Sequence, residues 1–345
     1  MRYVSLNDVV VGDVMARTLF NDNKLPLVKR GTKLTEGLIK SIKSRGFSTV
    51  LICDTDYESE VDDVISQELR ENAVEVLKEI VAELTNVSLV PKQNVMDKLR
   101  NIVELIINEL NGTTNNIVNL VDLKDFDNYT YTHSVNVAVL SLIVGIGLGY
   151  DMDKLMSLGI GAILHDIGKI DVPLEVLNKP GKLTDSEFSI IQEHPLSGVK
   201  RAKLMEDIGP TSIAVIRQHH EKVDGRGYPD GLKGNIIHEF ARIAAIADVY
   251  DALTSDRPYR KHWMPMEALE NLYGGCGTHF DINLVMEFKK HIAPFPVGSK
   301  VGLSDGREGY VVSNKNSSSR PIINCDSIFI DLGTELNLTI TSIAT

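Results

Sequence analysis

The sequence predicts a mainly α-helical protein with a small α+β module at its N-terminus and a short β-rich appendage at its C-terminus. Nearly every segment from about residue 117 to 293 has the apolar spacing of a helix. Short β-type runs separated by glycines occupy both flanks. A chain of 345 residues is long enough for two or three domains. We expect an N-terminal module at 1–57, a helical connector at 58–116, a large helical domain at 117–293 and the appendage at 294–345.

The first part of the chain contains predicted strands at 8–15 and 49–53 and a predicted helix at 35–43. From residue 58 to about 84, apolar residues recur every three or four positions, which indicates an amphipathic helix. We expect this apolar stripe to pack inside the chain, and a homodimer contact through it is the alternative. A second helix is predicted at 94–110, where an Asn-Gly pair follows as a stop signal.

The large helical domain has an apolar helix at 135–150 and another at 154–164. A further helix begins with a capping box formed by Thr184 and Glu187, and we expect it to end at His194, because Pro195 follows. After Pro294 the pattern changes to β-type runs at 310–312 and 328–330.

Composition excludes several classes of function. A formal net charge of -11 argues against a nucleic acid polymer as the partner, because such proteins need an extended basic surface. The three cysteines are widely separated and lack metal-type spacing. The longest charge-free apolar run, at 135–150, is shorter than the roughly 20 residues that a membrane span needs. With no signal-peptide pattern at the start, we expect a cytoplasmic protein without membrane contact.

Histidines and aspartates in apolar contexts point to a metal site. His165 and Asp166 follow an apolar helix, where a buried, unpaired carboxylate would cost several kcal/mol unless a cation compensates it. A single histidine in such a place is more often structural, so the number of such residues carries the argument. The candidate ligands are His133, His165, Asp166, His194, His219, His220 and Asp248.

The size of this set favours two ions. One catalytic ion needs about three or four protein ligands, whereas five histidines and two aspartates suffice for two ions that share a carboxylate. The absence of cysteine from the set favours iron or manganese over a structural zinc. Two divalent ions suit phosphate ester hydrolysis, because they lower the pKa of a shared water and stabilise the oxygens of an in-line displacement. We assign catalytic roles to Asp166, as the bridging carboxylate, and to Lys169.

Three cations near the predicted ligands support a phosphate substrate. Lys169 lies three residues after Asp166, and Arg257 and Arg260 follow Asp248. We expect Lys169, Arg257 and Arg260 to bind the substrate, and solvated surface charges are the alternative.

The order of these motifs resembles the HD-GYP family of cyclic dinucleotide phosphodiesterases. The match covers about residues 117–293. Its motifs are YTYTHS at 129–134, LHDIGK at 164–169, NKPGKLT at 178–184, HP at 194–195, HHE at 219–221, DGRGYP at 224–229, IAD at 246–248 and RPYR at 257–260.

The resemblance implies an all-helical HD-type catalytic domain that hydrolyses cyclic di-GMP to pGpG and, where the second ester is also cut, to GMP. A metal-bridged hydroxide would attack the phosphorus in line. The seven candidate ligands match the metal ligands of the family, and Lys169 and Arg257 match positions that hold phosphate or guanine. Arg260 stands where the family commonly has lysine, which keeps the charge but changes the donor geometry.

This sequence departs from some relatives in the expected metal count, and three alternative functions stay open. Some relatives carry a glutamate that binds a third metal four residues before the first histidine, and here that position is Tyr129, so we expect two ions. Relatives that prefer cyclic GMP-AMP differ by few side chains, so that substrate is one alternative. A sensor without activity, which would dock a partner through the 225–229 loop, is another, and a one-metal hydrolase of mononucleotides is a third.

Overall fold

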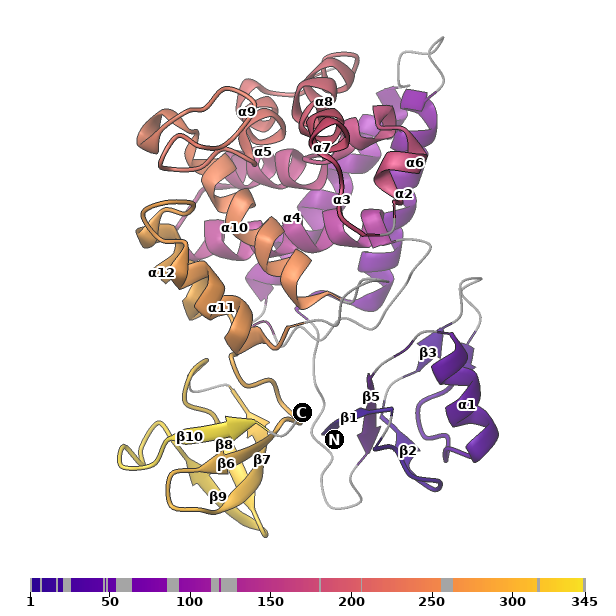
Figure 1. Cartoon of the computed structure of the whole chain (residues 1–345), viewed down its shortest axis with the longest axis vertical. Coiled ribbons are helices and arrows are strands. Elements are labelled where there is room, and N and C mark those ends of the chain that lie inside the picture. The colour runs from indigo at the N-terminus through magenta and orange to yellow at the C-terminus, as the bar shows by residue number, and fades with distance from the viewer. Residues whose placement is uncertain are drawn as a thin grey trace.

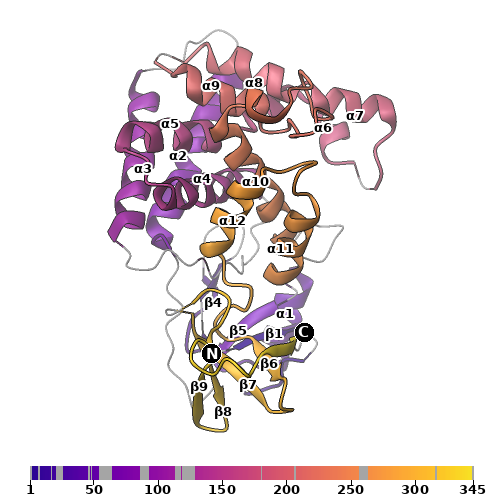
Figure 2. The ribbon, with the colours of Figure 1, turned by 90° about the vertical axis from the view of Figure 1, so that its left-hand side faces the viewer.

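The computed structural model describes residues 2–343 except for short segments. Those outside the description are 7, 17, 21–25, 46, 48, 54–63, 86–92, 113–117, 119–128, 180, 206, 256–262 and 315–316. The described residues form three separate hydrophobic cores, at 4–52, 64–292 and 297–332. Figures 1 and 2 show the large helical part on one side and both β-containing parts on the other.

The N-terminal core is built from short strands and one helix. Its three-stranded antiparallel sheet has the order β1-β5-β2, and β3 pairs with β4. Thr35 caps the helix by accepting a hydrogen bond from the backbone N–H of Leu38. The bounds are β1 Arg2–Ser5, β2 Val14–Met15, β3 Leu19–Phe20, β4 Pro26–Val28, α1 Glu36–Ser44 and β5 Thr49–Cys53.

One strand expectation in this module is wrong in extent. Residues 8–15 were expected to form a strand, but only Val14–Met15 does so. Val10 and Val11 are exposed, and Gly12 has φ +103°, a turn conformation that suits glycine. Only Val14 and Met15 of this run pair with a strand, β5, among the described residues, so the apolar residues before them do not extend the strand.

Helices α2 (Gln67–Thr85) and α3 (Gln93–Gly112) belong to the central core. The predicted apolar stripe is confirmed in α2, because Leu69, Ala73 and Ile80 are buried. The stripe packs within the chain, and α2 contacts both α3 and α4 (Tyr129–Gly147). The predicted start of the helix near residue 58 lies outside the described residues, which resume at Val64.

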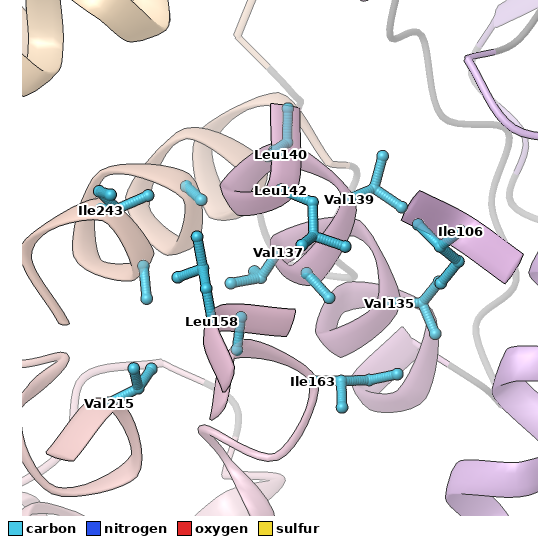
Figure 3. Close-up of a cluster of buried hydrophobic side chains, with 14 of the residues drawn as sticks. Ile106, Val135, Val137, Val139, Leu140, Leu142, Leu158, Ile163, Val215 and Ile243 are labelled. Atoms are coloured by element: carbon cyan, nitrogen blue, oxygen red, sulfur yellow. The ribbon is translucent and has the colours of Figure 1, made fainter. Parts of the chain in front are cut away.

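Helix α4 lies at the centre of the helical part and is covered on several sides. Figure 3 shows its valines and leucines meeting side chains of neighbouring helices. The window Thr130–Gly147 is long and apolar enough to cross a membrane, but 72% of it is buried inside the molecule, as in a core helix. The labelled neighbours are Ile106, Leu158, Ile163, Val215 and Ile243.

Of the remaining helices, α5, α10 and α12 pack against α4. Helix α7 begins with the predicted capping box, in which Thr184 and Glu187 exchange hydrogen bonds. The bounds are α5 Met152–Ile163, η1 Ile167–Asp171, α6 Leu174–Leu177, α7 Asp185–Gln192, α8 His194–Ala202, α9 Pro210–Gln218, η2 Gly234–Ile236, α10 Glu239–Thr254, α11 Pro265–Gly274 and α12 Ile282–Lys290.

The expectation that His194 ends a helix is wrong, because His194 begins α8. Pro195 lies in the first turn of that helix, where its missing N–H would have had no intrahelical partner. The proline therefore starts a helix here and fixes the position of the histidine before it.

The C-terminal part is a five-stranded antiparallel sheet with its own core. The strand order is β10-β6-β7-β8-β9, and β7 and β9 confirm the predicted strands. The mainly α fold class with two small β-containing flanks is confirmed. The bounds are β6 Lys300–Leu303, β7 Glu308–Ser313, β8 Ile322–Cys325, β9 Ile328–Asp331 and β10 Ile340–Ile343.

Candidate metal centre

The seven predicted ligands come from distant parts of the sequence and meet in the helical domain. Their side-chain ligand atoms form two groups, each with its atoms within 4.8 Å of one another. His133 lies on α4, Asp248 on α10 and His194 at the start of α8. His165 and Asp166 follow α5, and His219 and His220 follow α9. One group is Asp166, His194, His219 and His220, and the other is His133, His165 and Asp248.

The end of α9 lets two successive histidines reach the same group. Successive side chains on a helix point about 100° apart. Helix α9 ends at Gln218, and His219 is its C-cap. The two rings then lie with centroids 4.2 Å apart, and both contact His194. The pair therefore lies at a helix end, where both rings can belong to one group.

Gly168 brings the segment after Asp166 against helix α8. A Cβ atom at Gly168 would lie 2.0 Å from the carbonyl oxygen of His194 and 2.4 Å from the backbone nitrogen of Gly198. No side chain fits between these backbones. The glycine therefore allows η1 and α8 to approach closely enough for Asp166 and His194 to share one site.

Asp166 faces both groups with different oxygens. Its Oδ1 lies 3.3 Å from Nε2 of His194 and 3.9 Å from Nε2 of His219. Its Oδ2 lies 3.4 Å from Nε2 of His165 and 3.9 Å from Nε2 of His133. A carboxylate placed in this way has the geometry to bridge two cations.

Three histidine rings are oriented by main-chain carbonyls. The Nδ1 atoms of His165, His194 and His219 donate to the carbonyl oxygens of Ala162 (2.7 Å), Ile191 (2.6 Å) and Ile216 (3.0 Å). With the proton on Nδ1, the Nε2 lone pair is free to bind a metal. The Nε2 atoms of all three rings face Asp166.

Two buried atoms at the centre lack a hydrogen-bond partner among the described residues. They are Nε2 of His165 and Oδ1 of Asp166, and the two residues are 0% and 4% exposed. Buried polar atoms are rarely left without a partner, because this costs about 1–3 kcal/mol each. A divalent cation would satisfy both atoms, so the residues present fit a metal centre.

The electrostatics of the cluster also suit a cation. Burial alone would raise the pKa of Asp166, but Lys169 and His165 hold it well below its usual range, so the carboxylate is charged. Burial lowers the pKa of His219 and lowers that of His220 to about 3, so both rings are neutral near neutral pH. Charged carboxylates and neutral imidazoles are the protonation states that bind metals.

His133 is held by a side chain, which the sequence did not reveal. Its Nδ1 donates to Oδ2 of Asp251 at 2.6 Å, while its Nε2 lies 3.1 Å from Oδ1 of Asp248. Burial lowers the pKa of His133, but these two carboxylates outweigh burial and raise it to about 10 in the absence of a metal. Asp251 also accepts from Nδ2 of Asn136 at 2.9 Å, and Asn136 accepts from Arg70.

A sequence signal for these partners existed. Asp251 follows Asp248 by three residues in an apolar helix and is 1% exposed. Arg70 interrupts the buried stripe of α2 and is 9% exposed. Charged residues at buried helix positions require partners, so both could have been identified as polar contacts of the core.

The loop at 225–229 closes over the histidines. The ring of Tyr228 stacks on that of His220 with centroids 4.8 Å apart. The backbone N–H of Tyr228 donates to the carbonyl oxygen of His220. The carboxylate of Glu221, which is 2% exposed, accepts from the backbone N–H groups of Asp230 and Leu232. Glu221 therefore holds the backbone just after this loop beside the predicted ligands.

The predicted substrate residues are placed only in part. Lys169 forms an ion pair with Oδ2 of Asp166, and its side chain is 27% exposed while Asp166 is buried. Lys169 thus lies between the centre and solvent. Arg257 and Arg260 lie outside the described residues, and Tyr129 begins α4 but its side chain is also outside the description.

A helical domain with such a buried cluster of histidines and aspartates is typical of metal-binding helical proteins. Residues 114–284 match the HD domain family. The helical domain is thus an HD domain, and the resemblance to the HD-GYP family that its motifs predicted is confirmed.

Comparison with known proteins gives relatives of two substrate types. The chain is 41% identical over 204 residues, 59% of its length, to a cyclic di-GMP phosphodiesterase of Pseudomonas aeruginosa. It is 40% identical over 145 residues, 42% of its length, to a 3'3'-cGAMP-specific phosphodiesterase of Vibrio cholerae. These matches cover 49% and 33% of the two relatives, so the chain spans about half or less of their length.

The fold resembles a solved structure over most of the chain. An HDG"Y"P protein from Bdellovibrio bacteriovorus matches with a TM-score of 0.53 at 18% sequence identity. The match covers 83% of this chain and 97% of that protein. The similarity therefore extends beyond the residues that match the HD domain family.

Proposed function

We propose that this protein is a metal-dependent phosphodiesterase that hydrolyses cyclic di-GMP to pGpG and, where the second ester is also cut, to GMP. The observation that carries the proposal is the placement of Asp166, whose two oxygens face two separate groups of histidines. The sequence similarity to a cyclic di-GMP phosphodiesterase supports the choice of substrate.

The two groups of side chains would hold two divalent ions, iron or manganese. Asp166, His194, His219 and His220 would hold one, and His133, His165 and Asp248 the other, with Asp166 shared. When bound, two such ions lower the pKa of a water and stabilise the oxygens of an in-line displacement at phosphorus. The oxygen and nitrogen ligands, without sulfur, suit these metals.

The chain's own residues would orient the substrate. The Lys169 ammonium, already paired with Asp166 and partly exposed, is placed to bind a phosphate oxygen of a substrate that enters from solvent. Arg257 and Arg260 are the proposed further contacts with phosphate or guanine. Tyr228 keeps its proton, because burial and the charges of Asp248 and Asp166 raise its pKa, and its ring covers His220.

A second candidate substrate is cyclic GMP-AMP, which is favoured by the 40% identity to a 3'3'-cGAMP-specific phosphodiesterase. A sensor that has lost activity is less well supported, because all seven ligand positions are retained and grouped. A one-metal hydrolase would leave one of the two groups without a role.

The domain division and partners are part of the proposal. We assign catalysis to 117–293, flanked by the module at 1–57, the connector at 58–116 and the appendage at 294–345. A homodimer contact in the 58–84 segment would have to use residues other than the buried stripe of α2. The loop from Gly225 to Pro229 is the candidate contact for a protein partner.

The experiment that tests the function is product analysis with metal analysis. Protein purified without oxygen would be incubated separately with cyclic di-GMP, cyclic GMP-AMP and cyclic di-AMP. Conversion of cyclic di-GMP to pGpG with two metal ions per chain is the expected result, and His165→Ala should abolish it. Faster cleavage of cyclic GMP-AMP would move the assignment to the second candidate, and no cleavage of any of the three would overturn the proposal.

A further inference from the structure

We propose that Arg70, on helix α2, is a positioning residue of the metal centre that acts on His133 through Asn136 and Asp251. The inference rests on the proposed function, since it concerns the same metal centre. The contacts run without interruption from α2 to the metal ligand. Arg70 donates to Oδ1 of Asn136, Nδ2 of Asn136 donates to Oδ1 of Asp251 (2.9 Å), and Nδ1 of His133 donates to Oδ2 of Asp251 (2.6 Å).

Chemistry fixes which group donates in each hydrogen bond of this series. A guanidinium only donates hydrogen bonds and a charged carboxylate only accepts them. Asn136 must therefore turn its oxygen to Arg70 and its nitrogen to Asp251. Asp251 in turn can only accept from His133, so Nδ1 carries a proton, and Nε2, which faces Asp166 and Asp248, is the ring nitrogen that can bind a metal.

Arg70 has a specific task in this arrangement. An asparagine amide can rotate by half a turn, which exchanges its oxygen and nitrogen. In that orientation the amide oxygen would face Oδ1 of Asp251, and two acceptors would repel each other. The guanidinium of Arg70 favours the orientation that supports Asp251 and supplies positive charge near a buried carboxylate.

The elements make the chain of contacts rigid. Asn136 lies three residues after His133 on α4, and Asp251 three residues after Asp248 on α10, so each pair shares a helix face. Arg70 is 9%, Asn136 1% and Asp251 1% exposed, so water does not compete for these contacts.

Arg70 lies outside the segment that defines the family. The HD domain match covers residues 114–284, whereas Arg70 belongs to α2, which follows the N-terminal module in sequence. The metal centre therefore depends on a helix upstream of the HD domain. A displacement of α2 would remove the donor from Asn136 and loosen the orientation of His133.

The test compares three variants in the binding of Mn²⁺ to metal-free full-length protein. Arg70→Met keeps the apolar stem but removes the donors, and we expect the Kd for Mn²⁺ to rise by about 10–100-fold in one of two binding steps. Arg70→Lys retains a charge and donors, so its Kd for Mn²⁺ should lie between those of the wild type and Arg70→Met. The control Leu69→Ala disturbs the packing of the same helix beside Arg70 without touching the polar contacts, and its Kd should be that of the wild type.

A double variant tests whether Arg70 acts through Asn136 or only through packing. Asn136→Ala should weaken Mn²⁺ binding as Arg70→Met does, and the combination should be no weaker than Asn136→Ala alone, because both act through one path. In the metal-saturated enzyme, Arg70→Met should lower kcat and leave KM unchanged, since it does not contact substrate.

Two results would overturn the inference: wild-type Mn²⁺ affinity in Arg70→Met, or an equal loss of affinity in Leu69→Ala. Because Mn²⁺ binding is measured without nucleotide, the inference can be judged apart from the proposed function. A protein that cleaves no cyclic dinucleotide, but whose Mn²⁺ affinity falls in Arg70→Met, would refute the proposed substrate and retain the role of Arg70.

Discussion

Asp166 connects the two groups of histidines, and its neighbours explain why it is charged although buried. Lys169 and the surrounding imidazoles hold its pKa well below the usual range. In the metal-free chain this leaves negative charge at the centre of an apolar domain. A residue in this position is expected to control the occupancy of both proposed ions.

Replacement of Asp166 tests the bridging role. Asp166→Ala should lose both ions. The group of His194, His219 and His220 would have no carboxylate left, and the other group would lose the shared Asp166. Asp248→Ala should lose only the ion held with His133 and His165. The metal-to-protein ratio of each purified variant measures the effect. A full complement of metal in Asp166→Ala would show that this carboxylate does not bridge.

Replacement of Lys169 separates substrate binding from metal binding. Lys169→Ala should keep both ions, because the ammonium is not a ligand, and lose a charge-assisted contact worth about 1.5–3 kcal/mol. The kcat/KM should fall by about one to two powers of ten. A lower kcat as well would indicate that Lys169 stabilises the transition state.

The control for this variant is Lys200→Ala, an exposed lysine on α8. Its steady-state kinetics should equal those of the wild type. If Lys169→Ala behaves like Lys200→Ala, the substrate phosphate binds elsewhere on the helical domain.

The candidate ligands could be predicted from the sequence, and the buried charges of Asp251 and Arg70 could have been recognised, but not which ligand they orient. Histidine and aspartate beside apolar helices are unusual enough to be recognised one by one. Asp251, Asn136 and Arg70 act through contacts between three helices that are far apart in the chain. Their roles depend on tertiary packing, which local patterns do not encode.

At the scale of elements, the close approach of η1 and α8 decides the geometry of the centre. Gly168 and Gly198 face each other where these two elements meet. The segment that carries Asp166 and the helix that carries His194 are thus held together by backbone contact. Side-chain volume at this place would push them apart.

Gly168→Ala should therefore damage both stability and metal binding. The new Cβ would meet backbone atoms at 2.0 and 2.4 Å, and such overpacking costs about 1–3 kcal/mol or more. Urea unfolding and the metal-to-protein ratio measure the two effects. The matched control is Gly274→Ala at the end of α11, where a Cβ meets nothing within 4 Å, and both quantities should stay near wild type. A stable, fully metallated Gly168→Ala would contradict this account.

The helices and strands were predicted with unequal success for physical reasons. The capping box at Thr184 and the stripe of α2 were found because they depend on local spacing. His194 was assigned to the wrong end of a helix, because proline both stops one helix and starts another. Only the three-dimensional arrangement separates these two roles.

For the whole molecule, three separate cores have consequences for unfolding. The central core includes α2 and α3 as well as the HD domain, so residues 64–292 should unfold together. The N-terminal and C-terminal cores have their own buried side chains. A single two-state transition is therefore not expected.

Calorimetry with and without Mn²⁺ tests this organisation. Mn²⁺ should raise the melting temperature of the central transition alone. At 100 times its Kd it should add about 2.7 kcal/mol to the free energy of unfolding of that core. Ile52→Ala truncates a buried side chain of the N-terminal core and should destabilise that core by about 2–5 kcal/mol. The melting temperature of a different transition should therefore fall. One transition that responds to both changes would show that the cores unfold as one unit.

The way in which the histidines are held limits how this centre can change over evolutionary time. His165, His194 and His219 donate to main-chain carbonyls, and no substitution can delete a carbonyl. His133 donates to a side chain, which a single codon change can replace. Natural drift or deliberate redesign of the metal preference should therefore act first at Asp251 and its neighbours, while the other three rings keep their direction for as long as the fold itself survives.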